Sequence, residues 1–192
     1  NAGHIGASAG EVVVTADGRL TNSGSIMASG NITVVTPAEV DNSGLVSAGG
    51  TLALTAATVS NADTLGADLG LEGNALTINA NHIDNRNGAL RTDTELTVTS
   101  AGTLDNRDGL ISALQEVTLR DQGAVKALAI SNTAGTIIAG QTLSIDAASV
   151  SGDGQLLSHG DLAVKVVADF THTGEFTANN RATFETAGTL NN

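Results

Sequence analysis

Residues 104–119 read LDNRDGLISALQEVTL, and copies of this stretch recur along the whole chain. Leu104, Ile111, Val117 and Leu119 mark four large apolar positions that the copies repeat. An asparagine two residues after a large apolar residue aligns the copies. It occurs at Asn1, Asn22, Asn42, Asn61, Asn85, Asn106, Asn132 and Asn192. A period of about 20 residues is the sequence signature of a solenoid, in which each repeat stacks on the next.

The apolar residues of the aligned copies fall into columns. The first column is Ile5, Ile26, Val46, Leu65, Leu90, Ile111, Ile137, Leu156 and Phe176. Two positions later stands a small residue: Ala7, Ala28, Ala48, Ala67, Thr92, Ala113, Ala139, Ser158 and Ala178. The second and third columns are also two apart with a polar residue between them, as Thr97 stands between Leu96 and Val98. Residues two apart share one face of a strand, so this alternation predicts strands with one buried face.

These columns predict an all-β protein, a parallel β-helix of about nine rungs of about 20 residues each. A helical fold is a poor alternative because the apolar positions do not recur at intervals of three and four. The repeat leaves no boundary, so we expect a single domain over residues 1–192. The sequence begins and ends within the pattern, and we therefore expect a piece of a longer filament.

Two copies are longer than the rest. We expect loop insertions near residues 68–73, before Leu76, and near residues 120–128, before Ile130. Each insertion should bulge outward from the rod. Solenoids often place ligand sites on such insertions, but a simple length variant is the favoured interpretation here.

Composition removes several function classes. The net charge of −12 is spread along the chain and would repel the phosphates of a nucleic acid. The absence of cysteine excludes disulfides and thiolate chemistry. Aromatic residues make up 2% of the chain, so platforms for stacking sugar rings are absent. No apolar run reaches the roughly 20 residues of a membrane span.

The asparagine column is the most regular polar feature. Asparagine tolerates left-handed backbone angles and bonds to nearby backbone groups, so it suits a buried turn. We expect a structural asparagine ladder at an inward corner, formed by Asn22, Asn42, Asn61, Asn85, Asn106 and Asn132. A row of ligand-binding amides is the less favoured alternative. His172 falls in this column and is expected to take over the asparagine's hydrogen bond.

No catalytic, cofactor-binding or metal-binding residues are expected. The histidines, His4, His82, His159 and His172, do not align in a way that would gather three metal ligands. Adjacent copies of one pattern, Asp84-Asn-Arg86 and Asp105-Asn-Arg107, should stack two acids and two bases on the outer surface. We interpret them as surface ion pairs rather than as a catalytic carboxylate pair.

The aligned repeats resemble those of filamentous haemagglutinin-like exoproteins, which the two-partner pathway of Gram-negative bacteria secretes. LDNRDGLISALQEVTL, VDNSGLVSAGGTLALTA from Val40, IDNRNGALRTDTELTVTSAGTLDNRDG from Ile83 and the final AGTLNN carry the resemblance. It implies a right-handed parallel β-helix in a filament on the cell surface. It also implies that the parent protein needs an outer-membrane two-partner-secretion transporter, and that it is an adhesin or a carrier of a contact-dependent growth inhibition toxin.

Two functions follow as hypotheses. The first is a rigid extracellular stalk that presents an adhesive or toxin-delivery tip to other cells. The second is a receptor- or glycan-binding adhesin module that uses the loop insertions. A target-cell receptor is a possible partner under either hypothesis, whereas nucleic acid and small-molecule substrates are not expected. An enzymatic role has no support from the residues.

Overall fold

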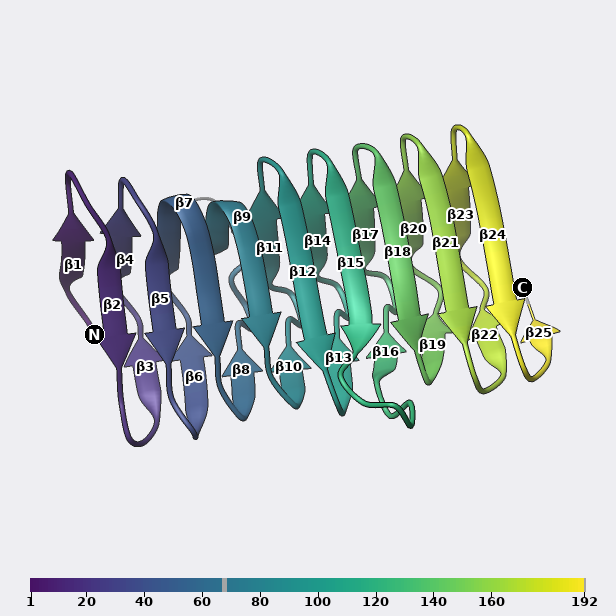
Figure 1. Cartoon of the computed structure of the whole chain (residues 1–192), viewed down its shortest axis with the longest axis horizontal. Coiled ribbons are helices and arrows are strands. Elements are labelled where there is room, and N and C mark those ends of the chain that lie inside the picture. Colours follow the sequence, from purple (N-terminus) through teal and green to yellow (C-terminus); the bar gives the residue numbers. More distant parts are fainter. Residues whose placement is uncertain (67–68, 192) are drawn as a thin grey trace.

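The computed structural model describes residues 1–66 and 69–191. In this part of the chain, strands and turns wind into about nine stacked rungs, so the molecule is a β-solenoid without helices (Figure 1). Because no helix is found there, none of the described residues forms a helix able to span a membrane. The all-β parallel fold predicted from the repeat is confirmed.

The strands form three faces. Face A contains β1 (His4–Ala7), β4 (Ser25–Ala28), β11 (Ala89–Thr92), β14 (Leu110–Ala113), β17 (Thr136–Ala139), β20 (Gln155–Ser158) and β23 (Glu175–Ala178). Face B contains β2 (Val12–Thr15), β5 (Ile32–Val35), β12 (Glu95–Ser100), β15 (Glu116–Asp121), β18 (Thr142–Ala147), β21 (Asp161–Val166) and β24 (Arg181–Thr186). The long strands β7 (Leu45–Thr55) and β9 (Gly70–Asn79) pass from face A into face B and join them into one sheet.

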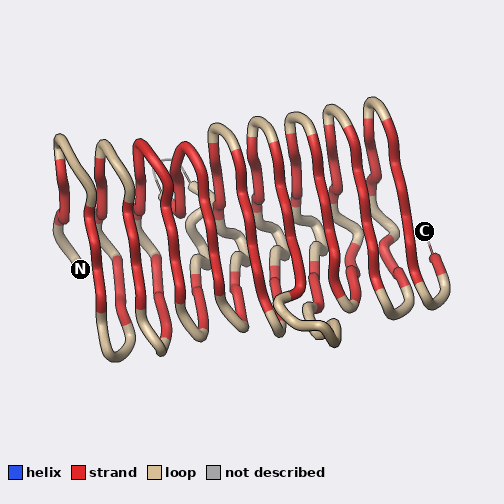
Figure 2. The backbone as a smooth tube through the Cα atoms, viewed as in Figure 1, coloured by secondary structure: helices blue, strands red, loops and turns tan. Residues whose placement is uncertain are grey.

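Face C is a separate sheet. It contains β3 (Leu20–Asn22), β6 (Glu39–Asn42), β8 (Thr58–Ser60), β10 (His82–Asp84), β13 (Thr103–Asp105), β16 (Ala129–Ser131), β19 (Ser149–Gly152), β22 (Phe170–His172) and β25 (Leu190–Asn191). Turns and loops connect the faces around the rod, except where β7 and β9 run from face A into face B without a break (Figure 2). In Figure 1 the chain runs down face B in front and up faces C and A behind, while the rungs advance from left to right. The β-helix is therefore right-handed.

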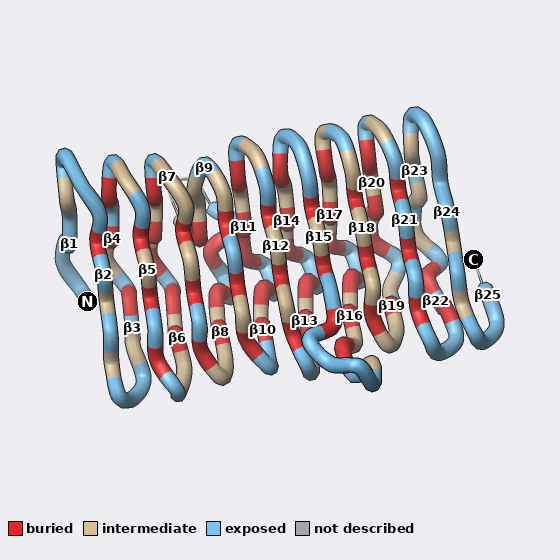
Figure 3. The backbone as a smooth tube through the Cα atoms, in the orientation of Figure 1, coloured by how far each residue is buried: buried red, intermediate tan, exposed pale blue. Residues whose placement is uncertain are grey.

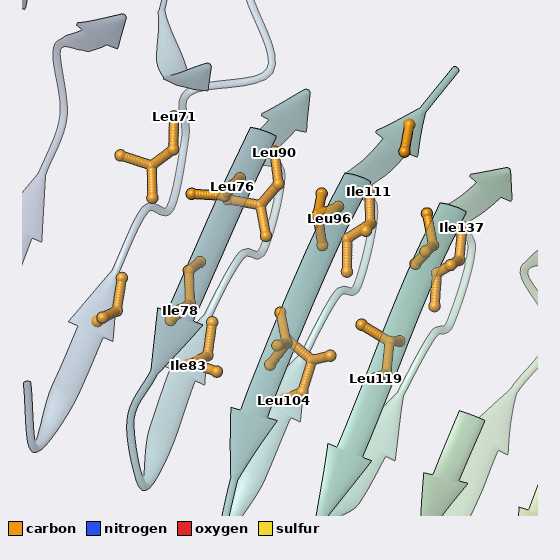
Figure 4. Close-up of a cluster of buried hydrophobic side chains, with 14 of the residues drawn as sticks. Leu71, Leu76, Ile78, Ile83, Leu90, Leu96, Leu104, Ile111, Leu119 and Ile137 are labelled. Atoms are coloured by element: carbon orange, nitrogen blue, oxygen red, sulfur yellow. The ribbon is translucent and has the colours of Figure 1, made fainter. Parts of the chain in front are cut away.

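Parallel pairing places equivalent residues of successive rungs beside each other. Ile111 pairs with Leu90 on one side and with Ile137 on the other, and all three side chains are fully buried. Figure 4 shows these side chains in one row inside the rod. Buried and exposed positions alternate along the strands (Figure 3), as period-two apolar patterns require. The aliphatic columns thus form one continuous core along the axis.

The first column contains one wrong assignment. Leu71, which is fully buried, pairs with Val46 and Leu90, whereas the predicted Leu65 is 36% exposed. Gly73 likewise pairs with Ala48 and occupies the small-residue position predicted for Ala67, which lies outside the described residues.

The predicted insertion at residues 68–73 is therefore also wrong in position, because residues 70–73 belong to β9. The extra residues lie earlier in the chain, between Asn61 and Gly70. Arg91 holds this segment by donating hydrogen bonds to the carbonyl oxygens of Leu65 and Leu69. Leu65 and Leu69 thus lie against the outside of face A, and β9 itself is not interrupted.

The second insertion leaves the rod after β15. Arg120 and Asp121 still belong to that strand, and residues 122–128 then project from the corner between faces B and C before β16 begins (Figure 1). Val125 in this loop is 86% exposed, whereas Leu128 is fully buried in the core. The loop therefore departs from the rod and returns to it within one rung.

The stacking predicts a large difference between core and surface truncations. Ile111→Ala should lower the free energy of unfolding by about 2–5 kcal/mol, because it opens a cavity between two rungs. Leu114→Ala is the control, since Leu114 in the adjoining turn is 66% exposed. Urea denaturation of both variants measures the effect. Equal stability of the two variants would contradict the register.

Candidate functional site

The six predicted asparagines form one hydrogen-bonded row inside the rod. Each Nδ2 donates to the Oδ1 of the asparagine in the next rung, from Asn1 through Asn132, at 2.7–2.9 Å. The side chains of the six from Asn22 to Asn132 are at most 1% exposed. Because each amide both accepts and donates along one line, neighbouring bonds polarise one another.

The same Nδ2 groups also bond to the backbone of the following rung. Asn61 donates to the carbonyl of Ala89 at 2.9 Å, and Asn85 donates to that of Leu110 at 3.2 Å. These carbonyls belong to the first residues of the next face A strands. The row therefore satisfies backbone acceptors at a buried corner where a turn interrupts the sheet.

The row stops after Asn132. Gly152 holds the next position and has no side chain, and His172 follows it in register. We expected His172 to replace the asparagine, but its Nδ1 accepts a hydrogen bond from the Gly174 N–H of its own turn at 3.2 Å. The ring packs against Phe176, with the two ring centroids 4.6 Å apart. Burial lowers the pKa of His172, so the ring is neutral at pH 7.

Charged residues pair on the outside of face C. Arg86 and Arg107 each bond to the aspartate two residues earlier, and Arg86 also lies 3.8 Å from Asp105 of the next rung. The hydrogen bond from Arg86 lowers the pKa of Asp84, although partial burial opposes it. The cluster expected from the sequence is thus present as exposed ion pairs. Such pairs contribute about 0–1 kcal/mol each.

A buried carboxylate that sequence reasoning missed holds the 122–128 loop. The Asp121 carboxylate accepts hydrogen bonds from the backbone N–H groups of Gly123, Ala127 and Leu128. Ser100 is the neighbour of Asp121 in the previous rung. Its hydroxyl accepts a hydrogen bond from the N–H of Gly102, two residues later, which corresponds to the bond from Gly123 to Asp121. The second carboxylate oxygen of Asp121 therefore binds the end of the longer loop, at Ala127 and Leu128, where the chain returns to the rod.

Electrostatics at Asp121 agree with this role. Burial alone would raise its pKa, but the N–H donors of Leu128, Gly123 and Ala127 outweigh burial and lower the pKa below its ordinary value of 3.8. Lys126 adds a smaller effect in the same direction and also pairs with Asp146 at 2.7 Å. The loop is thus held by an ionised carboxylate at neutral pH.

The histidines lie apart from one another. Nδ1 of His4 contacts the Ser25 hydroxyl, and Nδ1 of His82 contacts that of Thr103, each within its own face. Within residues 1–66 and 69–191, no three histidine, aspartate or glutamate side chains approach closely enough to hold a metal ion. The regular features of the described chain are therefore the core columns and the asparagine row.

Comparison with known proteins identifies the repeat. A model of the haemagglutinin repeat matches residues 7–73, 71–126 and 108–192, which together span nearly the whole chain. The chain belongs to the haemagglutinin repeat family. The resemblance to filamentous haemagglutinin-like exoproteins is thereby confirmed, and this haemagglutinin repeat segment is part of the filament of a secreted exoprotein.

One curated relative extends this assignment. Over 41 residues, or 21% of the chain, the haemagglutinin repeat segment is 51% identical to Toxin CdiA of Yersinia pestis. The aligned part is 1% of that protein, so the chain corresponds to a very small fraction of its length. No solved structure matches the chain.

The asparagine row predicts a specific loss of stability. Asn106→Ala removes the acceptor of the Asn85 amide and leaves the Asn132 Oδ1 without its donor. The free energy of unfolding should therefore fall by about 2 kcal/mol. Asn74→Ala, at an exposed position in β9, is the control and should have little effect. Thermal and urea unfolding measure both variants. A neutral Asn106→Ala would mean that the row adds nothing to stability.

The Asp121 contacts predict a local change in the loop. In Asp121→Asn, one oxygen becomes an NH₂ group that cannot accept a bond, so amide exchange at Ala127 and Leu128 should accelerate at least about tenfold. Gln122→Ala, in the exposed part of the same loop, is the matched control. Hydrogen exchange followed by NMR measures the rates.

The same contacts fix the sign of the pH dependence. Because folding lowers the pKa of Asp121, its stabilisation is complete above the ordinary value of 3.8 and declines as pH falls toward the lower folded value. Loop protection in the wild type should therefore be constant from neutral pH to about pH 5. Protection that declines already near pH 6 would rule out the carboxylate as the group that holds the loop.

Proposed function

We propose that this haemagglutinin repeat segment is a rigid stalk that spaces an adhesive or toxin-delivery tip from the surface of a Gram-negative cell. The observation that carries the proposal is the unbroken stacking of core residues from rung to rung along the axis. Each rung lengthens the rod by the spacing of neighbouring strands, about 4.8 Å. A rung also packs on both neighbours, so the segment resists bending.

The parent exoprotein would use an outer-membrane two-partner-secretion transporter. A chain without cysteine forms no disulfides that could obstruct its passage. Folding of each rung onto the preceding one outside the cell would oppose backward movement. We also propose that the segment has no enzymatic role, since the regular features described above are structural.

The stalk is tested by removing one rung from the full-length exoprotein. Deleting residues 86–106 joins Asn85 to Arg107 and leaves an intact turn in register. We expect this variant to be secreted, to shorten the filament by about 4.8 Å, and to keep its binding to target cells. Deleting residues 86–95 is the control, because half a rung breaks the register and should prevent folding.

A second function is favoured by one observation. The 122–128 loop is held by Asp121 and exposes Val125 at its surface, so it is suited to direct contact with a target-cell receptor or glycan. Replacing residues 122–127 by a single Ala would remove this loop and keep the rod. Two residues, the new Ala and Leu128, would then separate β15 from β16, just as two residues separate β12 from β13 in the previous rung. Cell adhesion measured on this variant separates the two functions. Lost adhesion with an intact rod would favour the loop.

A further inference from the structure

The aromatic residues of the chain gather around one histidine. His172 on β22 is fully buried, and the chain's three phenylalanines, Phe170, Phe176 and Phe184, lie on β22, β23 and β24 (Figure 1). The ring centroid of His172 lies 4.6 Å from that of Phe176 and 6.2 Å from that of Phe170. The Phe184 ring packs on both of these phenylalanines. A titratable side chain therefore lies within an apolar cluster built from three consecutive strands.

Hydrogen bonding selects the neutral form of this ring. Nδ1 of His172 accepts a hydrogen bond from the Gly174 N–H at 3.2 Å, so the proton of the neutral ring is on Nε2. Nε2 is buried and has no hydrogen-bond partner among residues 1–66 and 69–191. In the charged ring both nitrogens are donors, and a proton on Nδ1 would point at the Gly174 N–H. Protonation of His172 therefore breaks the bond that holds the turn at residues 172–174.

The neighbouring rung offers the charged ring no side-chain acceptor. Gly152 lies beside His172 on face C and has no side chain. The asparagine row ends one rung before Gly152, at Asn132, whose Nδ2 donates to the carbonyl of Gln155. In the part of the chain that the structure describes, no asparagine of the row bonds to the ring. The histidine column position is thus polar in residue type and apolar in its surroundings.

Few charged groups surround the ring. Burial, the larger effect, lowers the pKa of His172 below its ordinary value of 6.5, and Asp153 in the turn after β19 opposes it. The strands β19 and β22 contain no charged residue, and Leu190 and Asn191 of β25 are uncharged. The other charged residues on the elements around β22 are exposed: Asp169, Glu175, Arg181 and Glu185. No described carboxylate therefore bonds to the ring to compensate a positive charge within the cluster.

We propose that His172 is a pH-sensitive switch whose neutral ring keeps β22, β23 and β24 packed together and whose protonation loosens these strands in acid. The sign follows from linkage. Because the folded chain disfavours the charged ring, the opened chain binds the proton more strongly. The stability of this region should therefore be constant above about pH 6.5 and decline as pH falls below it. The stalk would be rigid at neutral pH and locally flexible in an acidic environment.

Hydrogen exchange followed by NMR on the 192-residue chain tests the switch. The amide of Gly174 reports the turn directly, and the amides of Thr173 and Glu175 report the bonds to the Gly152 and Gly154 carbonyls. The measured quantity is the protection factor, the exchange rate of an unstructured peptide divided by that of the protein. Between about pH 6.5 and pH 5 it should fall by up to about tenfold per pH unit, the effect of one linked proton. The 122–128 loop should keep its protection.

Two variants separate His172 from other acid effects. An asparagine in this column can accept the same bond, as Asn1 does from the Gly3 N–H at 3.1 Å. His172→Asn should therefore keep the turn and show no decline in Gly174 protection between about pH 6.5 and pH 5. His159→Asn is the matched control, since His159 is exposed in the turn between β20 and β21. This control should retain the full pH dependence of the wild type.

The wild type alone can also overturn the proposal, which matters if His172→Asn does not fold. NMR titration of the histidine ring carbons should give His172 a lower pKa than the exposed His159. Gly174 protection that stays constant from about pH 7.5 to pH 5 would contradict the switch, as would an equal decline in His172→Asn. An equal loss of protection over all three faces would show general acid unfolding and would also contradict it.

Discussion

The strand residues of this rod lie beside the residues at the same positions of the next rung. That constraint decides which side chains a column can hold. An aliphatic column needs only matching volumes, as in the stack of Leu90, Ile111 and Ile137. A buried polar column must instead bond to copies of itself. The carboxamide of asparagine has a donor and an acceptor on one group, whereas a carboxylate or an ammonium would stack like charges.

The same constraint acts on the surface, where acidic and basic side chains are combined so that like charges do not stack unpaired. Asp84 lies directly beside Asp105 on face C, and each has an arginine two residues later that pairs with it. On face B the sign alternates from rung to rung instead, from Asp146 to Lys165 to Glu185. Either arrangement keeps an acidic chain from repelling itself along its axis.

The columns could be predicted from the sequence because they depend on local spacing. The assignment of Leu65 failed because Leu65 and Leu71 each precede a small residue by two positions. Only pairing with Val46 and Leu90 distinguishes them, and pairing is not a local property. Asp121, in contrast, stands two residues before Gly123, and this turn signal could have been recognised.

The hydrogen bonds of the asparagine row all point in one direction along the axis. Every Nδ2 donates toward the rung that follows, and every Oδ1 accepts from the rung that precedes. A cross-section through the row therefore presents amide hydrogens on one cut surface and amide oxygens on the other. Two such surfaces are complementary in a single head-to-tail orientation, so a filament built from these rungs is a polar object whose two ends are chemically distinct.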